Sequence, residues 1–282
     1  MFVEQTSKFV FNVSLPALIF LKISTIEISS AFDPLLIALS FVLVIVFAIF
    51  SWFLALTVTK KPKEVGVFTQ GSFRSNFAII GLALIANLSG EKQLGKASLL
   101  LAFIMPLYNI LGVVFLTIPF NYRKKLPLPH ILYEIIKNPL IIAALLAAPF
   151  SIFHLNPGSI TVTTLSYLSK IALPLALIGI GASLNIKNLK KASKLSFIAS
   201  FNKLITFPLI AIFLAYLLNF DKNQTVILFV LFASPTAIVS FIMADTMGSN
   251  SKLASDIIVI STLFSVITIS TGIIFLKLYS LI

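Results

Sequence analysis

The chain has 282 residues, of which 59% are hydrophobic and only 11% are charged. A soluble globular protein carries roughly 25% charged residues, so this chain cannot cover a water-facing surface and is an integral membrane protein. Its formal net charge of +12 does not indicate nucleic-acid binding, because the basic residues cluster between apolar blocks, and the lack of cysteine excludes disulfides and thiolate metal sites.

The apolar blocks are about 20 residues long, which is the length of a helix that spans a bilayer, whereas barrel strands alternate over roughly 10 residues. We therefore predict an all-α polytopic membrane protein. The third of its segments is too short to cross a bilayer alone. In chain order the nine predicted segments cover residues 8–26, 34–58, 74–88, 96–120, 137–154, 160–184, 195–219, 224–246 and 253–278.

Basic residues are distributed unevenly between the two sides of these segments. Fourteen of the 21 lie before the first segment or in the connections after the second, fourth, sixth and eighth, and five lie on the other side. The positive-inside tendency places the start of the first segment in the cytoplasm and the C-terminus outside. We expect a multi-pass protein of the plasma membrane, which in a bacterium is the inner membrane. Arg74 is among the fourteen, and we favour a topology signal over a substrate ligand for it.

Related stretches recur about 160 residues apart. The first segment contains VSLPALIFL around Pro16 and the sixth IALPLALIGI around Pro174, while the third contains RSNFAIIG and the eighth SPTAIVSF. The offset spans five segments, an odd number, so the members of each pair cross the membrane in opposite directions, as in the inverted repeats of secondary transporters.

The fifth segment has no partner in the chain, because that partner would lie about 20 residues before Met1. Either the start codon is misassigned or the protein works with nine helices. We expect a five-plus-five plan whose first helix is missing from this sequence.

Two segments carry polar groups at membrane depth and are predicted to be broken. Pro235 removes a backbone N–H in the middle of the eighth segment, so that helix must kink or break. In the third segment we place the break at Gly71, which is conformationally permissive, and at the polar residues after it. Half-helix N-termini that meet at the two breaks would favour an anion. The predicted substrate-binding residues are Ser75, Asn76, Ser234, Pro235, Thr236 and Ser240.

Three basic residues are candidates for attracting an anion, namely Arg74, Lys170 and Lys203. A charge as deep in a segment as Lys170 indicates function, although its side chain could equally snorkel to the interface. Pro16 and Pro174 are interpreted as structural kinks. No His, Cys or acidic cluster has metal-ligand or catalytic spacing, so we expect no metal site, no cofactor and no enzyme, and a coupling ion stays open.

Four stretches together resemble the auxin efflux carrier family, whose bacterial members look like permeases for organic anions such as malate and malonate. The stretches are VSLPALIF, RSNFAIIGLAL, LPLALIGIGASL and SPTAIVSFIMADTMGSN, in the family's order over nearly the whole chain. The resemblance implies a five-plus-five inverted repeat of the bile-acid-symporter type, with a scaffold domain and a mobile transport domain in which two broken helices cross. By position, Asn76 matches the first crossover, and Pro235 and Thr236 match the second.

The resemblance also implies a domain plan and a mechanism. Residues 1–32 and 127–190 would form the scaffold, and residues 33–126 and 191–282 the transport domain, with crossovers at 69–88 and 231–246. The expected function is secondary transport of a mono- or dicarboxylate by elevator-like alternating access. A sodium-coupled symporter is the open alternative, and an anion channel or a non-transporting receptor is less favoured. The expected partners are the organic anion, membrane lipid and a second copy of the chain bound through the scaffold.

Overall fold

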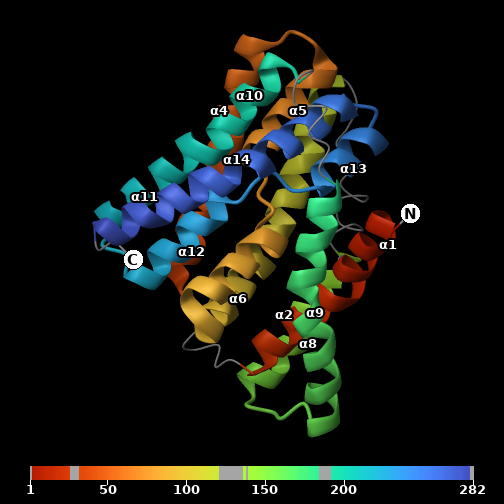
Figure 1. Ribbon diagram of the computed structural model, residues 1–282, viewed down its shortest axis with the longest axis vertical. Coiled ribbons are helices and arrows are strands. Elements are labelled where there is room, and N and C mark those ends of the chain that lie inside the picture. The colour runs from red at the N-terminus through yellow and green to blue at the C-terminus, as the bar shows by residue number, and fades with distance from the viewer. Residues whose placement is uncertain (1, 26–31, 121–135, 138, 184–191, 280–282) are drawn as a thin grey trace. The chain divides into compact units, whose positions relative to one another are not determined.

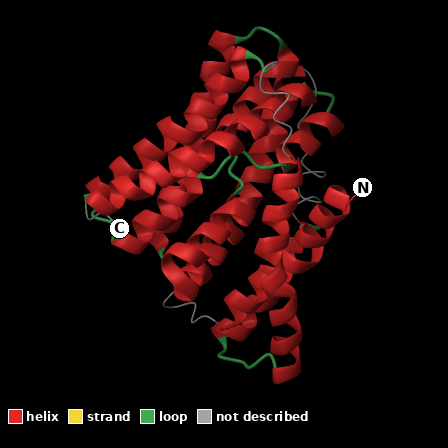
Figure 2. Cartoon of the chain, in the orientation of Figure 1, coloured by secondary structure: helices red, strands yellow, loops and turns green. Residues whose placement is uncertain are grey.

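The computed structural model describes residues 2–25, 32–120, 136–137, 139–183 and 192–279 (Figure 1). These ranges consist of helices and their connections, and no strand occurs within them (Figure 2). The prediction of an all-α polytopic membrane protein is therefore confirmed. Contacts within the chain define two compact units, the first made of Met1–Ile37, Ala78–Pro106 and Pro129–Leu184, and the second of Ala38–Phe77, Leu107–Leu128 and Asn185–Ile282.

In the first unit, α2 packs closely against α8 and α9. Small residues on α2 and α8, such as Ala17 and Ala147, are buried and allow the helices to approach each other. The rings of Phe20 and Phe150 meet edge to face with their centroids 5.5 Å apart. The helices of this unit are α1 (Phe2–Phe9), the π-helical turn η1 (Val10–Ser14), α2 (Leu15–Thr25), α8 (Pro139–Ile152) and α9 (Ser159–Ser183).

In the second unit, α11 packs against α12, and α14 packs against α5, α10 and α13. Helix α6 (Leu82–Thr117) belongs to both units and is divided by Gly90, whose φ of 77° is not helical. The other helices are α4 (Pro34–Val58), α5 (Pro62–Phe73), η3 (Ile118–Phe120), α10 (Lys194–Phe201), η5 (Asn202–Thr206), α11 (Phe207–Leu217), α12 (Lys222–Ala233), α13 (Val239–Thr246) and α14 (Ser251–Leu278).

The repeat predicted from the sequence is present in the helix bounds. Helices α5 and α12 each contain 12 residues. Their first residues, 62 and 222, are 160 positions apart, and so are their last residues, 73 and 233. The starts of α4 and α10, at residues 34 and 194, are also 160 apart. The two halves of the second unit thus repeat one order of elements, a long apolar helix followed by a short helix that ends in a break.

Within the described residues, four helical stretches are long and apolar enough to cross a membrane, namely Pro34–Val58, Phe77–Thr117, Lys194–Leu217 and Ser251–Leu278. The first of them coincides with the predicted segment at 34–58. On this helix Phe47, Ser51 and Ala55 are buried at helical spacing, while Val46 and Phe53 are exposed. A helix that is apolar on both its buried and its exposed face is suited to contact protein on one side and lipid on the other.

Helix α5 is the main difference between the predicted and the observed elements. The predicted third segment begins at residue 74, whereas the structure has a helix from Pro62 to Phe73 before it. Every residue from Val65 to Phe73 is buried, although this stretch includes Thr69, Gln70 and Ser72. Neighbouring helices rather than lipid bury α5, so its polar composition conceals it from a hydropathy reading.

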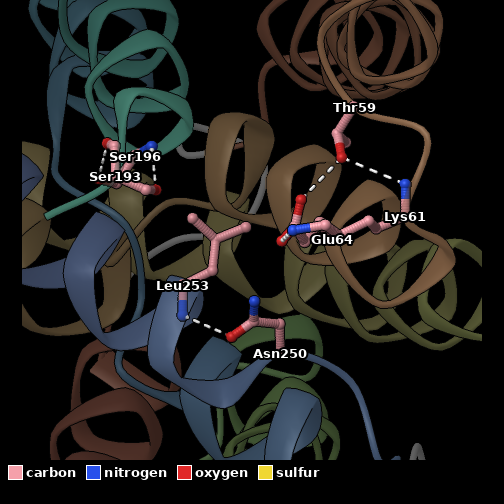
Figure 3. A network of polar contacts seen from close by, with 7 residues as sticks. All are labelled: Thr59, Lys61, Glu64, Ser193, Ser196, Asn250 and Leu253. Atoms are coloured by element: carbon pink, nitrogen blue, oxygen red, sulfur yellow. Dashed lines mark hydrogen bonds and ion pairs between the residues drawn. The ribbon is translucent and has the colours of Figure 1, made fainter.

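Two helices of the second unit, α14 and α10, begin with a side-chain cap (Figure 3). Leu253 N donates to Asn250 Oδ1 over 3.0 Å at the start of α14, and Ser196 N donates to Ser193 Oγ over 3.4 Å at the start of α10. Before α5, Thr59 Oγ1 donates to Glu64 Oε2 over 2.7 Å. The two caps satisfy backbone N–H groups that have no partner within the helix, and the Thr59–Glu64 bond links the start of α5 to the residues before it.

Candidate functional site

The first break in the second unit lies immediately after α5. Backbone at Arg74 is extended (φ −75°, ψ 122°), and helix resumes with the π-helical turn η2 (Phe77–Gly81). The prediction that Gly71 makes this break is wrong, because Gly71 lies inside α5. Its missing side chain instead permits close packing, since a Cβ at this position would lie 2.7 Å from Ile257 Cδ1 of α14.

The second break lies between α12 and α13, where the sequence predicts it. Helix α12 ends at Ala233, and Ser234 is extended (φ −61°, ψ 140°). Helix resumes at Val239. Proline disfavours helical backbone at the preceding residue and provides no N–H to continue the helix, so Pro235 accounts for both the extended Ser234 and the interruption.

The two breaks, which we call the crossover (residues 74–76 and 234–238), contact each other directly. Ser75 and Thr236 form an antiparallel β-bridge. Asn76 N donates to Pro235 O over 2.7 Å, and Thr236 Oγ1 donates to Gly71 O over 2.6 Å. The predicted meeting of two broken helices is therefore a hydrogen-bonded contact between their backbones.

Most hydroxyl groups of the crossover hold its backbone. Ser75 Oγ donates to Ser234 O over 3.5 Å, and Ser234 Oγ donates to Val230 O over 2.6 Å. By contrast, the side-chain amide of Asn76 forms no hydrogen bond with the described residues, and the buried Ser240 hydroxyl has no partner among them either. Of the predicted ligands, Asn76 and Ser240 thus carry polar groups that are not already engaged within the second unit.

Arg74 lies at the crossover and is 3% exposed, so its guanidinium is buried within the protein, and its role as a topology signal stays a prediction. Its NH2 donates to Asn109 Oδ1 over 2.7 Å, and its NH1 donates to Tyr108 O over 3.2 Å and to Met243 Sδ over 3.1 Å. All three acceptors are neutral, and no carboxylate of the described residues pairs with Arg74. The crossover therefore contains a buried guanidinium that has no counter-charge within the part of the chain that the structure describes.

Space for the guanidinium is provided by a glycine of α6. A Cβ on Gly112 would lie 2.9 Å from Arg74 NH1 and 2.8 Å from Gln70 Nε2, so any larger residue there would displace the ends of both side chains. Two polar atoms next to Arg74, Gln70 Oε1 and the Tyr108 hydroxyl, are buried and have no hydrogen-bond partner among the described residues. Unpaired buried groups of this kind are costly unless a ligand or water completes them.

Sequence reasoning missed the residues that surround Arg74. Tyr108 and Asn109 follow Pro106 in a run that is otherwise apolar, and a polar Asn109 at membrane depth is a signal that would have identified them. Gly112 and Met243 carry no such signal, because their roles depend on contacts between α6 and α13 and the first break. We call Gln70, Arg74, Tyr108, Asn109 and Met243 the arginine cluster.

The remaining predicted residues lie elsewhere. Lys203 is fully buried in the second unit, and its Nζ donates to Phe232 O over 2.6 Å. Lys170 is exposed on α9 of the first unit, with its Nζ 6.0 Å from the centre of the Tyr167 ring. Pro16 is the second residue of α2, which begins where the π-helical turn η1 ends, and Pro174 lies inside α9.

Comparison with known proteins places the whole chain among transporters. A family model described as a membrane transport protein matches residues 3–130 and 125–273. An uncharacterized transporter of Methanocaldococcus jannaschii is 27% identical over 273 residues, which cover 93% of this chain and 85% of that protein. An uncharacterized transporter of Methanothermobacter thermautotrophicus is 24% identical over 267 residues, which cover 93% of this chain and 85% of that protein. Both breaks lie within the matched residues.

Proposed function

The chain belongs to the membrane transport protein family, the auxin efflux carrier family that its motifs resemble, and we propose that it transports a small organic anion by alternating access. The substrate is a mono- or dicarboxylate. The protein acts in the plasma membrane, with the start of its first segment in the cytoplasm and its C-terminus outside, and it forms a homodimer through the scaffold.

The observation that carries the anion assignment is the uncompensated charge of Arg74. A guanidinium buried without a counter-charge is costly, and a carboxylate that pairs with it through two parallel hydrogen bonds would lower that cost. Arg74 has donors of the right geometry for such a pair, and its present acceptors are a carbonyl, an amide oxygen and a thioether. A cationic substrate would be repelled from the same position.

Other groups at the crossover suit an anion as well. The side-chain amide of Asn76 and the hydroxyls of Ser240 and Tyr108 can each donate a hydrogen bond, and the described residues engage none of them. Ser240 lies in the first turn of α13, where the helix carries partial positive charge. These groups would orient a carboxylate that Arg74 attracts.

An elevator-like movement is part of this proposal. Both breaks and the whole arginine cluster belong to one compact unit of the chain. The groups assigned to substrate can therefore move together as one body, which is the requirement of a transport domain that carries its site across the membrane.

Uptake by proteoliposomes tests the proposal. The purified protein is reconstituted and offered labelled acetate, lactate, malonate, malate and succinate, and we expect saturable uptake of at least one of them. Current without saturation would instead indicate a channel, and binding without flux would indicate a receptor.

Arg74→Gln keeps hydrogen-bond donors and removes the charge, so we expect at least a tenfold loss of uptake, with partial recovery in Arg74→Lys. Lys170→Gln is the matched control, because it removes an exposed cation of the first unit, and it should transport as the parent protein does. Undiminished uptake by Arg74→Gln would contradict the anion site.

A further inference from the structure

Lys203 is a second buried cation of the second unit, and its environment differs from that of Arg74. The side chain is 0% exposed, and its ammonium donates a 2.6 Å hydrogen bond to Phe232 O. Among the described residues no carboxylate pairs with it. Among the described residues, the ammonium thus binds a backbone carbonyl oxygen and no other protein group.

That carbonyl belongs to the end of a half-helix. Helix α12 ends at Ala233, so Phe232 is in its last turn, where carbonyl groups have no intrahelical partner and the helix carries partial negative charge. The oxygen is only three residues before Pro235 of the crossover. In other inverted-repeat transporters, the C-terminal ends of half-helices and unwound carbonyls coordinate the coupling Na⁺ or H⁺.

Local structure explains how a lysine reaches this position. Lys203 lies in the π-helical turn η5, which interrupts the helical run from α10 to α11. A π-turn adds a residue to the turn and changes which side chains face inward, and such turns are frequent at functional sites. Aromatic rings fix the surroundings, because Phe47 stacks on Phe207 at 4.2 Å and meets the Phe232 ring at 5.1 Å.

We propose that the Lys203 ammonium is a tethered substitute for a coupling cation at the end of α12, so that transport by this chain does not depend on Na⁺. This inference rests on the proposed function and deepens it, because it decides between uncoupled and sodium-coupled transport. The ammonium is hydrogen-bonded to the carbonyl oxygen that a metal ion would need as a ligand, and its positive charge repels a second cation. Lys203 accordingly belongs to the stabilisation of the broken helix and is not a ligand of the substrate.

A stability measurement without substrate tests the inference. Thermal unfolding of the purified protein is followed at equal ionic strength in sodium, potassium and choline chloride. We expect the same midpoint in all three salts. A saturable stabilisation by Na⁺ alone would overturn the inference, regardless of the unfolding midpoints of the Lys203 variants.

Lys203→Ala removes the ammonium and leaves room for a small cation, so we expect a lower midpoint that propylammonium chloride restores in a saturable manner. Lys203→Met should lose stability without recovery, because its uncharged side chain fills the space. A merely structural lysine would give an alanine variant that no cation restores, and that result, or an unchanged alanine variant, would overturn the inference. Lys170→Ala is the matched control and should respond to none of these salts.

Flux gives the second measurement. With labelled malate as the probe, uptake by the parent protein should agree within twofold whether the outer salt is sodium, potassium or choline chloride. A tenfold loss in choline chloride would overturn the inference. If none of the labelled carboxylates is taken up, the proposed function fails, while the thermal comparison still decides the role of Lys203.

Discussion

Two neighbouring polar side chains of the crossover perform different tasks. The hydroxyl of Thr236 is committed to Gly71 O over 2.6 Å, whereas the amide of Asn76 is bonded to none of the described residues. A side chain that holds the backbone affects folding when it is changed, and a side chain that awaits a ligand affects binding. The two residues can therefore be separated by comparing stability with transport.

We predict that Asn76→Ala raises the KM for uptake about tenfold and leaves the unfolding midpoint nearly unchanged, because no bond within the second unit is lost. Thr236→Val, which conserves shape, should lower stability by about 1–3 kcal/mol, since Gly71 O loses its hydroxyl partner in a buried position. Thermal unfolding and uptake of each variant provide the test. A destabilised Asn76→Ala with an unchanged KM would contradict the assignment.

The residues of the site could be predicted from the sequence only where a local pattern exists. Pro235 identifies its own break, because a proline acts on the backbone of its neighbours. The environment of Arg74 is formed by Tyr108, Asn109 and Met243, which are 34 to 169 residues away in the chain. No hydropathy pattern reports such contacts, so an arginine beside a polar stretch resembles a loop residue until its partners are known.

At the scale of the element, α5 depends on glycines for its close contacts. A Cβ on Gly66 would lie 2.4 Å from the backbone oxygen of Phe115, and a Cβ on Gly71 would lie 2.7 Å from the end of the Ile257 side chain. A side chain can rotate away, whereas a helix backbone cannot move without disturbing its hydrogen bonds. The same substitution to alanine on the same helix would therefore clash with backbone at position 66 and with a side chain at position 71.

We predict that Gly66→Ala destabilises the protein by about 1–3 kcal/mol and that Gly71→Ala costs less, as expected for overpacking against backbone and against a flexible side chain. Thermal unfolding of the two variants in one detergent measures the difference. Equal midpoints would show that α5 adjusts as a whole rather than at the point of contact.

The bounds of a helix were predictable from the sequence where the helix is apolar along most of its length. Helix α4 is apolar throughout and has the predicted bounds of 34–58. Helix α5 contains Thr69, Gln70, Gly71 and Ser72, and its sequence alone is that of a polar connection. Its counterpart α12 differs in composition although it has the same length, so the offset of 160 residues is the better guide to α5.

At the scale of the whole molecule, the predicted inversion of the repeat relates the starts of α5 and α12. Helices α5 and α12 are equivalent, and their broken ends meet in an antiparallel bridge. Their beginnings should therefore lie on opposite sides of the membrane. The chain contains no cysteine, so single-cysteine variants can be prepared without altering the background.

We predict that a membrane-impermeant maleimide added to intact cells labels Asn223→Cys and fails to label Lys61→Cys, since both side chains are exposed and the second is assigned to the cytoplasm. Permeabilised cells, in which both variants should react, provide the control. Labelling of both variants in intact cells would contradict the inversion, and labelling of Lys61→Cys alone would reverse the orientation.

The division into scaffold and transport domains stays a prediction, while the period of the repeat is now observed in the helix bounds. A repeat is readable from sequence because equivalent helices meet equivalent packing and accumulate similar side chains. Which helices move together depends on contacts between elements that are distant in the chain, and the sequence carries no local record of these.

The contact between the two breaks has an evolutionary consequence. Its bond from Asn76 N to Pro235 O joins two main chains, and any residue that supplies an N–H could replace the asparagine in it. This backbone bond of the crossover therefore makes few demands on the identity of the side chain at position 76. Selection can exchange the groups around it to accept a new solute, and the architecture that presents them does not have to be invented again.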